Sequence, residues 1–132
     1  MSLSAPVSNA LRLTFTAPPP GLAPLVEFEL APVPGGVGLY TLRDLAGADL
    51  RLFLVDPRFY VPEYAPGIPA EQLARLGAAS PAELDVYVVA TLAAEAPVVN
   101  LLAPILVNAG SASATQVILE EDWPLQAELI AA

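Results

Sequence analysis

Residues 98–108 read Val-Val-Asn-Leu-Leu-Ala-Pro-Ile-Leu-Val-Asn, and this stretch decides the fold. It holds two short apolar runs, 98–102 and 104–108, which favour short strands. A polar segment, 108–113, follows them, and Gly110 offers the positive φ that a hairpin loop uses. Residues 115–120 then predict a further strand, so this part of the chain is expected to form consecutive short strands.

Strand signals continue toward the N-terminus. Residues 11–16 and 26–30 alternate apolar with polar side chains, which is typical of a half-buried strand. Residues 39–42 predict a short strand. Residues 51–56 carry four apolar side chains in a row and predict a strand that is buried on both faces. Residues 85–92 are rich in β-branched and aromatic residues and predict one more.

Between these strands the pattern changes to short helices. Residues 69–77 predict a helix with Pro69 at its first position and Gly77 as its left-handed stop. Residues 80–83 (Ser-Pro-Ala-Glu) have the capping-box pattern and predict one more helical turn. The irregular, proline-rich segment 56–68 precedes both of them.

About eight short strands with turn signals between them predict a mainly β fold. We expect an antiparallel β-barrel, or a barrel-like sandwich, with one or two short helices on one side. The length of 132 residues suits a single domain, 1–132. Residues 1–10 and 126–132 are expected to be flexible tails, although Trp123 and Leu125 could tie down part of the C-terminal segment.

The composition excludes several kinds of chemistry. The chain contains no cysteine, histidine or lysine, so it offers no disulfide, no imidazole base, no thiol nucleophile and no Schiff-base amine. Paired carboxylates could run glycosidase chemistry, but nothing marks two of the fourteen acidic residues as opposed across a cleft. We therefore expect a protein that is not an enzyme and needs no cofactor or metal.

The charge balance bears on partners and location. A net charge of −9 would repel a nucleic-acid backbone and attract a basic protein. Residues 96–119 carry no charge, but the polar side chains of their second half argue against a membrane span. The N-terminus lacks the basic and apolar pattern of a signal peptide. We expect a cytoplasmic protein with no direct nucleic-acid or membrane partner.

Two segments are candidates for protein binding. The loop 56–64 combines arginine with aromatic residues, which are enriched in interface hot spots. The alternative is that its aromatic side chains plug the barrel end while Asp56 caps the turn. The second segment is residues 100–102. Here Asn100 could satisfy backbone groups, and either Leu101 or its neighbour Leu102 could face outward. The acidic run 120–122 is either a contact for a basic partner or a solvated strand end. The candidate protein-binding residues are Asp56, Arg58, Phe59, Tyr60, Tyr64, Asn100 and Leu101.

The quoted segment also resembles a known family. Residues 99–108 (VNLLAPILVN) are similar to the VNLLAPIVIN segment of bacterial flagellar assembly factors of the FliW family. Residues 116–119 (QVIL) follow at the distance expected in that family, and residues 56–64 resemble its DP…F.P.Y loop. The resemblance covers about residues 50–125. Before it, the family's GLLGF turn and FYWLQS strand are only echoed or replaced, and the family's YPVRHPL ending is here Trp-Pro-Leu-Gln.

The resemblance implies a FliW-type β-barrel that acts as a partner switch and is a monomer when free. FliW proteins bind cytoplasmic flagellin, and they bind CsrA, an RNA-binding translational regulator that represses flagellin synthesis. Accumulating flagellin would withdraw the protein from CsrA by mass action. The divergent N-terminal half leaves open a chaperone-like flagellin binder without the CsrA role. A third interpretation, a small-ligand barrel, would need an internal cavity.

Overall fold

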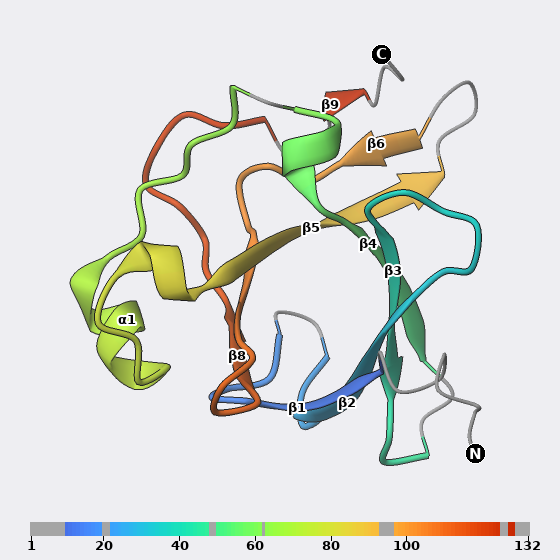
Figure 1. Ribbon diagram of the computed structural model, residues 1–132, viewed down its shortest axis with the longest axis horizontal. Coiled ribbons are helices and arrows are strands. Elements are labelled where there is room, and N and C mark those ends of the chain that lie inside the picture. Colours follow the sequence, from blue (N-terminus) through green and yellow to red (C-terminus); the bar gives the residue numbers. More distant parts are fainter. Residues whose placement is uncertain are drawn as a thin grey trace.

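The computed structural model describes residues 10–19, 22–47, 50–61, 63–92, 97–124 and 127–128 (Figure 1). The chain is mainly β, and its only α-helix among the described residues stands to one side of the strands. Its elements are β1 (Leu11–Phe15), β2 (Glu27–Pro32), β3 (Leu39–Asp44), β4 (Arg51–Val55), η2 (Pro57–Phe59), α1 (Ala70–Arg75), η3 (Pro81–Glu83), β5 (Asp85–Leu92), β6 (Pro97–Val99), β7 (Ile105–Asn108), β8 (Ser113–Gln116) and β9 (Ala127–Glu128).

The strands close into a barrel because β4 pairs on both of its sides. The sheet runs β4-β3-β2-β1-β8-β7-β5, and a second pairing joins β5 back to β4. Closure leaves no free edge along those paired residues. The long strand β5 pairs with β7 through its first residues and with β6 through its last, so β6 and then β9 extend the sheet beyond the barrel. The predicted mainly β, barrel-like fold is confirmed.

One pairing departs from the expected antiparallel pattern. Strand β1 runs parallel to β8, with Thr14 opposite Ser113 and Phe15 opposite Ala114. The two strands stand far apart in the sequence, so no hairpin turn fixes their relative direction. The remaining strand pairs are antiparallel.

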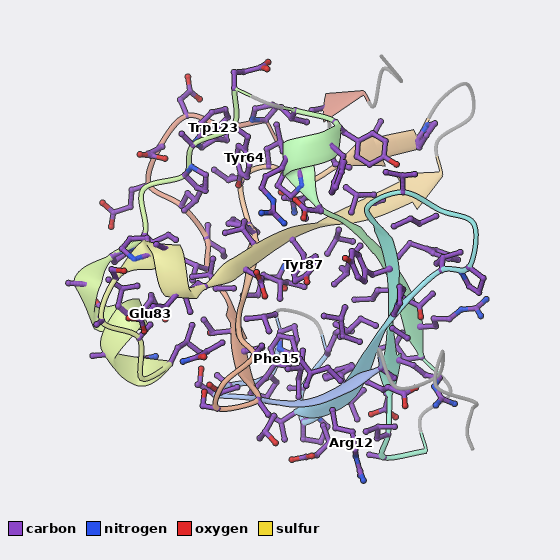
Figure 2. All side chains as sticks on the ribbon, viewed as in Figure 1. Arg12, Phe15, Tyr64, Glu83, Tyr87 and Trp123 are labelled. Carbon is purple, nitrogen blue, oxygen red and sulfur yellow. The ribbon has the colours of Figure 1, made fainter. Side chains whose placement is uncertain are left out.

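The barrel interior is filled with side chains. Figure 2 shows Phe15 and Tyr87 directed into the barrel, whereas Arg12 points away from it. The rings of Phe15 and Phe28 meet edge to face with their centroids 5.2 Å apart. This packed interior argues against the small-ligand barrel. The buried residues of the cluster are Leu13, Phe15, Phe28, Leu30, Leu42, Leu54, Tyr87, Ile105, Val107 and Ala114.

A second apolar cluster attaches the helical segment to the barrel. Leu76, just after α1, packs with Leu84 and with Leu106 of β7. The amide of Asn108 also donates a hydrogen bond of 2.6 Å to the carbonyl of Leu76. Gly77 adopts the predicted left-handed conformation with φ of 71° and ends the helix. The short helix is therefore held by packing, since its own length gives it little independent stability.

The structure differs in detail from the predicted starts and caps of the short helices. Pro69 is the N-cap of α1, one position before the first helical residue Ala70, and not the first helical residue as predicted. The capping-box pattern forms the short 3-10 turn η3, but the side chain of Ser80 makes no cap hydrogen bond. Instead, the carboxylate of Glu83 accepts a 3.1 Å hydrogen bond from the backbone N–H of Ala79. The capping-box pattern therefore predicted the turn correctly, but Glu83 accepts from the N–H of Ala79 and not from that of Ser80.

The predictions for some strands and for one turn need correction. Strand β4 is not buried on both faces, because Phe53 is 40% exposed and lies beneath the guanidinium of Arg51. Positive φ in the β7–β8 turn falls on Ala112, at 58°, and not on Gly110, whose N–H instead bonds the side chain of Asn108. The expected strands 98–102 and 115–120 end early, at Val99 and Gln116.

Side-chain and proline chemistry explain those early strand ends. The side chain of Asn100 accepts hydrogen bonds from the N–H groups of Leu102, at 3.0 Å, and Ala103, at 3.2 Å. This turn replaces a ladder with local bonds. Beyond β8, Val117 donates to the carbonyl of Pro104, but Pro104 has no N–H to return. The chain stays extended there without completing a regular ladder.

The C-terminal segment is tied to the loop before α1. The carboxylate of Glu121 accepts hydrogen bonds from the N–H of Gly67, at 3.0 Å, and from the indole of Trp123, at 2.8 Å. The Trp123 ring meets Tyr64 edge to face, with centroids 4.7 Å apart (Figure 2). These two hydrogen bonds lower the pKa of Glu121 below its ordinary value of 4.5. The predicted anchoring by Trp123 is confirmed, whereas Leu125 lies outside the described residues.

Most of the predicted flexible tails also lie outside the described residues. Residues 1–9, 126 and 129–132 belong to this part, whereas Ala127 and Glu128 form β9 against β6. Within the described part of the chain, no helix is long and apolar enough to cross a bilayer. The uncharged stretch 96–119 contains the short strands β6, β7 and β8.

Truncation of Leu101 tests its place in the core. Because the side chain is 3% exposed, we expect Leu101→Ala to lower the free energy of unfolding by about 2–5 kcal/mol. Urea denaturation measures this value. Ile118→Ala is the matched control, since its side chain is 63% exposed and should change stability by less than about 0.5 kcal/mol. Equal losses in both variants would contradict the assignment of Leu101 to the core.

The Glu121 hydrogen bonds predict an acid-sensitive anchor. Its pKa is lowered in the folded protein, so its stabilising contribution is present above the unfolded pKa and is lost as the pH falls through the folded value. Glu121→Gln keeps an acceptor oxygen but does not titrate. Thermal unfolding followed between neutral and acidic pH should show a smaller acid-induced loss of stability in this variant. An identical loss in both proteins would mean that the anchor does not sense pH.

Candidate functional site

The candidate site is the loop 56–64, which follows the end of β4 at the barrel rim. Asp56 is buried and caps the turn η2, with its carboxylate accepting a 3.0 Å hydrogen bond from the backbone N–H of Arg58. Its own N–H donates to the carbonyl of Gly38, at 2.8 Å, in the β2–β3 connection. Asp56 therefore performs the capping role that was one of the two sequence-based alternatives.

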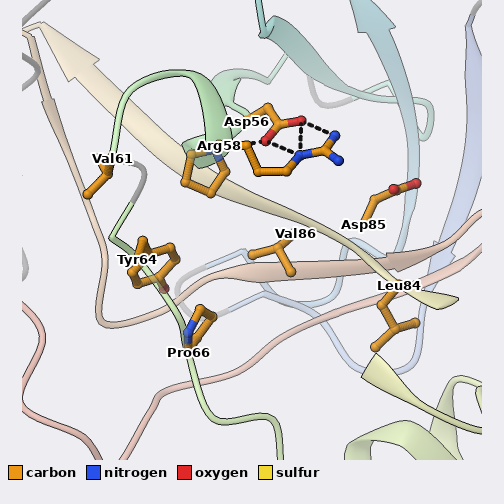
Figure 3. Close-up of a pocket in the computed structure, with 9 residues that line it drawn as sticks. Asp56, Arg58, Val61, Tyr64, Pro66, Leu84, Asp85 and Val86 are labelled. Atoms are coloured by element: carbon orange, nitrogen blue, oxygen red, sulfur yellow. Dashed lines mark hydrogen bonds and ion pairs between the residues drawn. The ribbon is translucent and has the colours of Figure 1, made fainter. Parts of the chain in front are cut away.

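Arg58 closes an ion pair on the same carboxylate. Its Nε donates to both carboxylate oxygens of Asp56, at 3.0 and 3.1 Å, and one terminal nitrogen donates at 2.6 Å (Figure 3). Hydrogen bonding to Asp56 and the carboxylate charge raise the pKa of Arg58, and Asp85 adds to this effect. The Arg58 side chain is largely exposed while its partner is not. The pair therefore presents a fixed guanidinium at the surface.

Phe59 is the exposed aromatic residue of the loop. Its side chain is 55% exposed, and its ring lies against Gly38, where a Cβ atom would stand 2.6 Å from the ring. Beside Gly38, Val37 is 62% exposed. The hydroxyl of Tyr60 donates to the carbonyl of Val37 and so joins the two loops. Phe59 and Val37 are therefore two exposed apolar side chains on a braced support, and we call them the Phe59–Val37 pair.

Tyr64 lies at the inner end of the loop and serves the core. Its hydroxyl donates a 2.6 Å hydrogen bond to the carbonyl of Leu101, and its ring packs on Trp123. Burial raises the pKa of Tyr64, and the charge of Glu121 adds to this effect. The structure thus brings Tyr64 next to the second candidate segment. It divides the loop into an outer part with Phe59 and an inner, supporting part with Tyr64.

The second candidate segment, Asn100 and Leu101, supports the site from the core. The amide oxygen of Asn100 holds the turn after β6, and Leu101 is buried among Val55, Val88 and Val99. Of the two neighbours, either of which could have faced outward, Leu101 faces inward, because this turn directs it into the core. Phe59 is exposed, whereas Leu101 can influence a surface only through the backbone that it supports.

A cavity of about 160 Å³ opens beneath η2, beside the start of β5 (Figure 3). Its volume is below the roughly 300 Å³ at which small-molecule pockets begin. Among the described residues, no three acidic side chains stand close enough to hold a metal ion. The lining residues are Asp56, Pro57, Arg58, Val61, Tyr64, Pro66, Leu84, Asp85 and Val86.

Sequence reasoning missed Val37 as a part of this surface. Its loop, residues 33–38, reads only as a glycine-rich turn. The left-handed conformation of Gly38, at φ of 66°, and its contact with Phe59 are what place Val37 beside the candidate loop. The available signal was a single valine between two glycines. This local pattern does not indicate that the valine lies beside the loop 56–64.

Comparisons with known proteins agree with this fold. The family described as FliW protein matches residues 4–129 of the chain. A flagellar assembly factor FliW of Thermotoga neapolitana is 33% identical over 104 residues, covering 76% of this chain and 70% of that protein. That of Thermotoga maritima is 30% identical over 124 residues, covering 91% and 83%. A crystal structure of the flagellar assembly factor FliW superposes with a TM-score of 0.83 at 23% identity, over 92% of this chain and 86% of that one. The chain belongs to the FliW family of flagellar assembly factors.

Proposed function

We propose that this flagellar assembly factor acts by binding other proteins, namely flagellin and the RNA-binding translational regulator CsrA. Flagellin and CsrA would compete for it through antagonistic complexes, so that scarce flagellin leaves the protein free to occupy CsrA and to relieve repression of flagellin translation. Family membership supports this choice of partners. The activity takes place in the cytoplasm, needs no cofactor and involves no catalytic step.

The observation that carries a binding role is the Phe59–Val37 pair. Both side chains are mostly exposed, yet their backbones are held by the Tyr60 contact and by the bond from Asp56 to Gly38. A support that is already ordered loses little conformational entropy when a partner docks. Phenylalanine also supplies a large apolar area at such an anchor. The fixed guanidinium of Arg58 adds a polar contact next to it.

The charge of the chain supports a basic partner. An RNA-binding protein such as CsrA must present a basic surface to phosphates, and the net charge of −9 favours its approach. This attraction acts mainly on the association rate and weakens with salt. Acidic side chains stand outward on β2, where Glu29 pairs with Arg43 at 2.8 Å, and on residues 120–122.

A second candidate is a chaperone-like factor that binds flagellin without a CsrA role. The departures from the family's motifs in the N-terminal half favour it, since a partner surface could have changed there while the barrel was kept. The two candidates share the flagellin complex and differ only in CsrA binding. Titration can therefore separate them.

Calorimetric titration against CsrA of the same organism is the direct test. We expect saturable binding of CsrA by this protein, and we expect saturation with flagellin beforehand to abolish it. CsrA and flagellin mixed without this protein are the control. Tight binding of flagellin with no binding of CsrA would contradict the switch and leave the chaperone-like factor. Binding of neither partner would contradict both candidates.

Phe59→Ala tests the anchor. We expect the affinity for the partner that uses this surface to fall by roughly tenfold or more, since truncation of a hot-spot side chain costs about 2 kcal/mol or more. Phe53→Ala is the matched control, because Phe53 is also an exposed phenylalanine but lies on β4. Circular dichroism should show both variants folded. Unchanged affinity for both partners in folded Phe59→Ala would reject the pair as an interface.

A further inference from the structure

The chain beyond β8 forms one more extended segment. The N–H groups of Val117 and Leu119 donate to the carbonyls of Pro104, at 3.0 Å, and Leu102, at 2.8 Å. Val117 and Leu119 are buried against the helical cluster, whereas Ile118 between them is 63% exposed. This alternation is that of a strand with one face buried. Residues 117–119 therefore continue the β7–β8 pairing on one side only.

The other side of this segment is an open strand edge. Alternate residues of an extended chain direct their N–H and C=O groups to opposite sides, so those of Ile118 face away from residues 102–104. Neither group of Ile118 makes a hydrogen bond with any residue that the structure describes. Strand β1 occupies this side only as far as Ala114, whose carbonyl accepts from Thr16 at 2.9 Å. Strand β1 is followed by Pro18 and Pro19, which offer no further ladder donor because proline has no backbone N–H.

We propose that an extended, basic segment of a partner protein adds as a strand to this edge at Ile118. A strand added there would bond the N–H and C=O of Ile118 and cover its exposed side chain. Residues 120–122 (Glu-Glu-Asp) follow at once and are exposed, so they would face basic side chains of that segment. Glu121 is held in place by Gly67 and Trp123, which fixes one of these charges beside the edge.

The same charges decide against a second copy of this chain as the occupant. Any pairing of two copies at this edge would join molecules that each carry a net charge of −9, and a parallel pairing would also bring their acidic runs together. Charged residues beside an edge strand are a common protection against self-association. The surface involves none of the residues of the loop 56–64, and it does not depend on the partners proposed above.

A short capped peptide of sequence RVTVRVT is a suitable probe, since an extended form presents valines on one face and arginines and threonines on the other. We expect fluorescence anisotropy of the labelled peptide to show saturable binding to the full chain. Amide hydrogen exchange followed by NMR should show the N–H of Ile118 slowed about tenfold or more in the complex. Failure to bind up to millimolar peptide would overturn the proposal.

Two matched changes separate strand addition from charge attraction. A peptide with N-methyl groups on all of its backbone amides keeps its charges but has no N–H group for strand pairing, and we expect it not to bind. Ile118→Thr should weaken the binding of RVTVRVT roughly tenfold by removing apolar contact, whereas Val37→Thr, at an equally exposed position, should not. Equal binding of the methylated peptide would overturn the proposal. So would sedimentation showing a dimer that Ile118→Thr dissociates, since the edge would then serve a second copy.

Discussion

The pairing of β4 with β5 is the constraint on which the rest of the structure depends. Residues 53–55 lie opposite 88–90, and this contact converts an open sheet into a barrel. Because β4 then ends at the rim, the loop that follows it must turn sharply there, which is where Asp56 caps η2. The same contact places Val55 and Val88 against Val99 and Leu101, so the core reaches the turn after β6. Closure thus positions both candidate segments.

Most polar side chains of the candidate site hold backbone in place. Asp56, Asn100 and Tyr64 each bond backbone groups that their loops would otherwise leave unpaired. This support is what allows Phe59 to remain exposed on an ordered loop. A flexible loop of the same composition would lose more entropy on docking. The rigid support and the exposed aromatic residue are therefore parts of one arrangement.

Charge and strand edges act together on association. A barrel removes most free edges, but the pairing of β1 with β8 ends at Ala114, and Ile118 beyond β8 bonds no residue that the structure describes through its backbone groups. The acidic run beside that end repels copies of the chain and attracts basic segments. The overall negative charge has the same two effects at longer range, because it repels other copies and attracts basic partners. Salt screening limits the distance over which it acts.

The sequence by itself determined the β class, most strand positions and the short helix, because the alternation of residues 11–15 and 27–30 and the stop at Gly77 are local signals. It also determined the charge and the absence of histidine, cysteine and lysine. Only the tertiary structure decided that β1 lies parallel to β8, that Leu101 is buried and that Gly38, next to Val37, lies against the ring of Phe59. These facts depend on which distant segments meet when the barrel closes. Local periodicity carries no information on such meetings, since burial and pairing are settled by partners far along the chain.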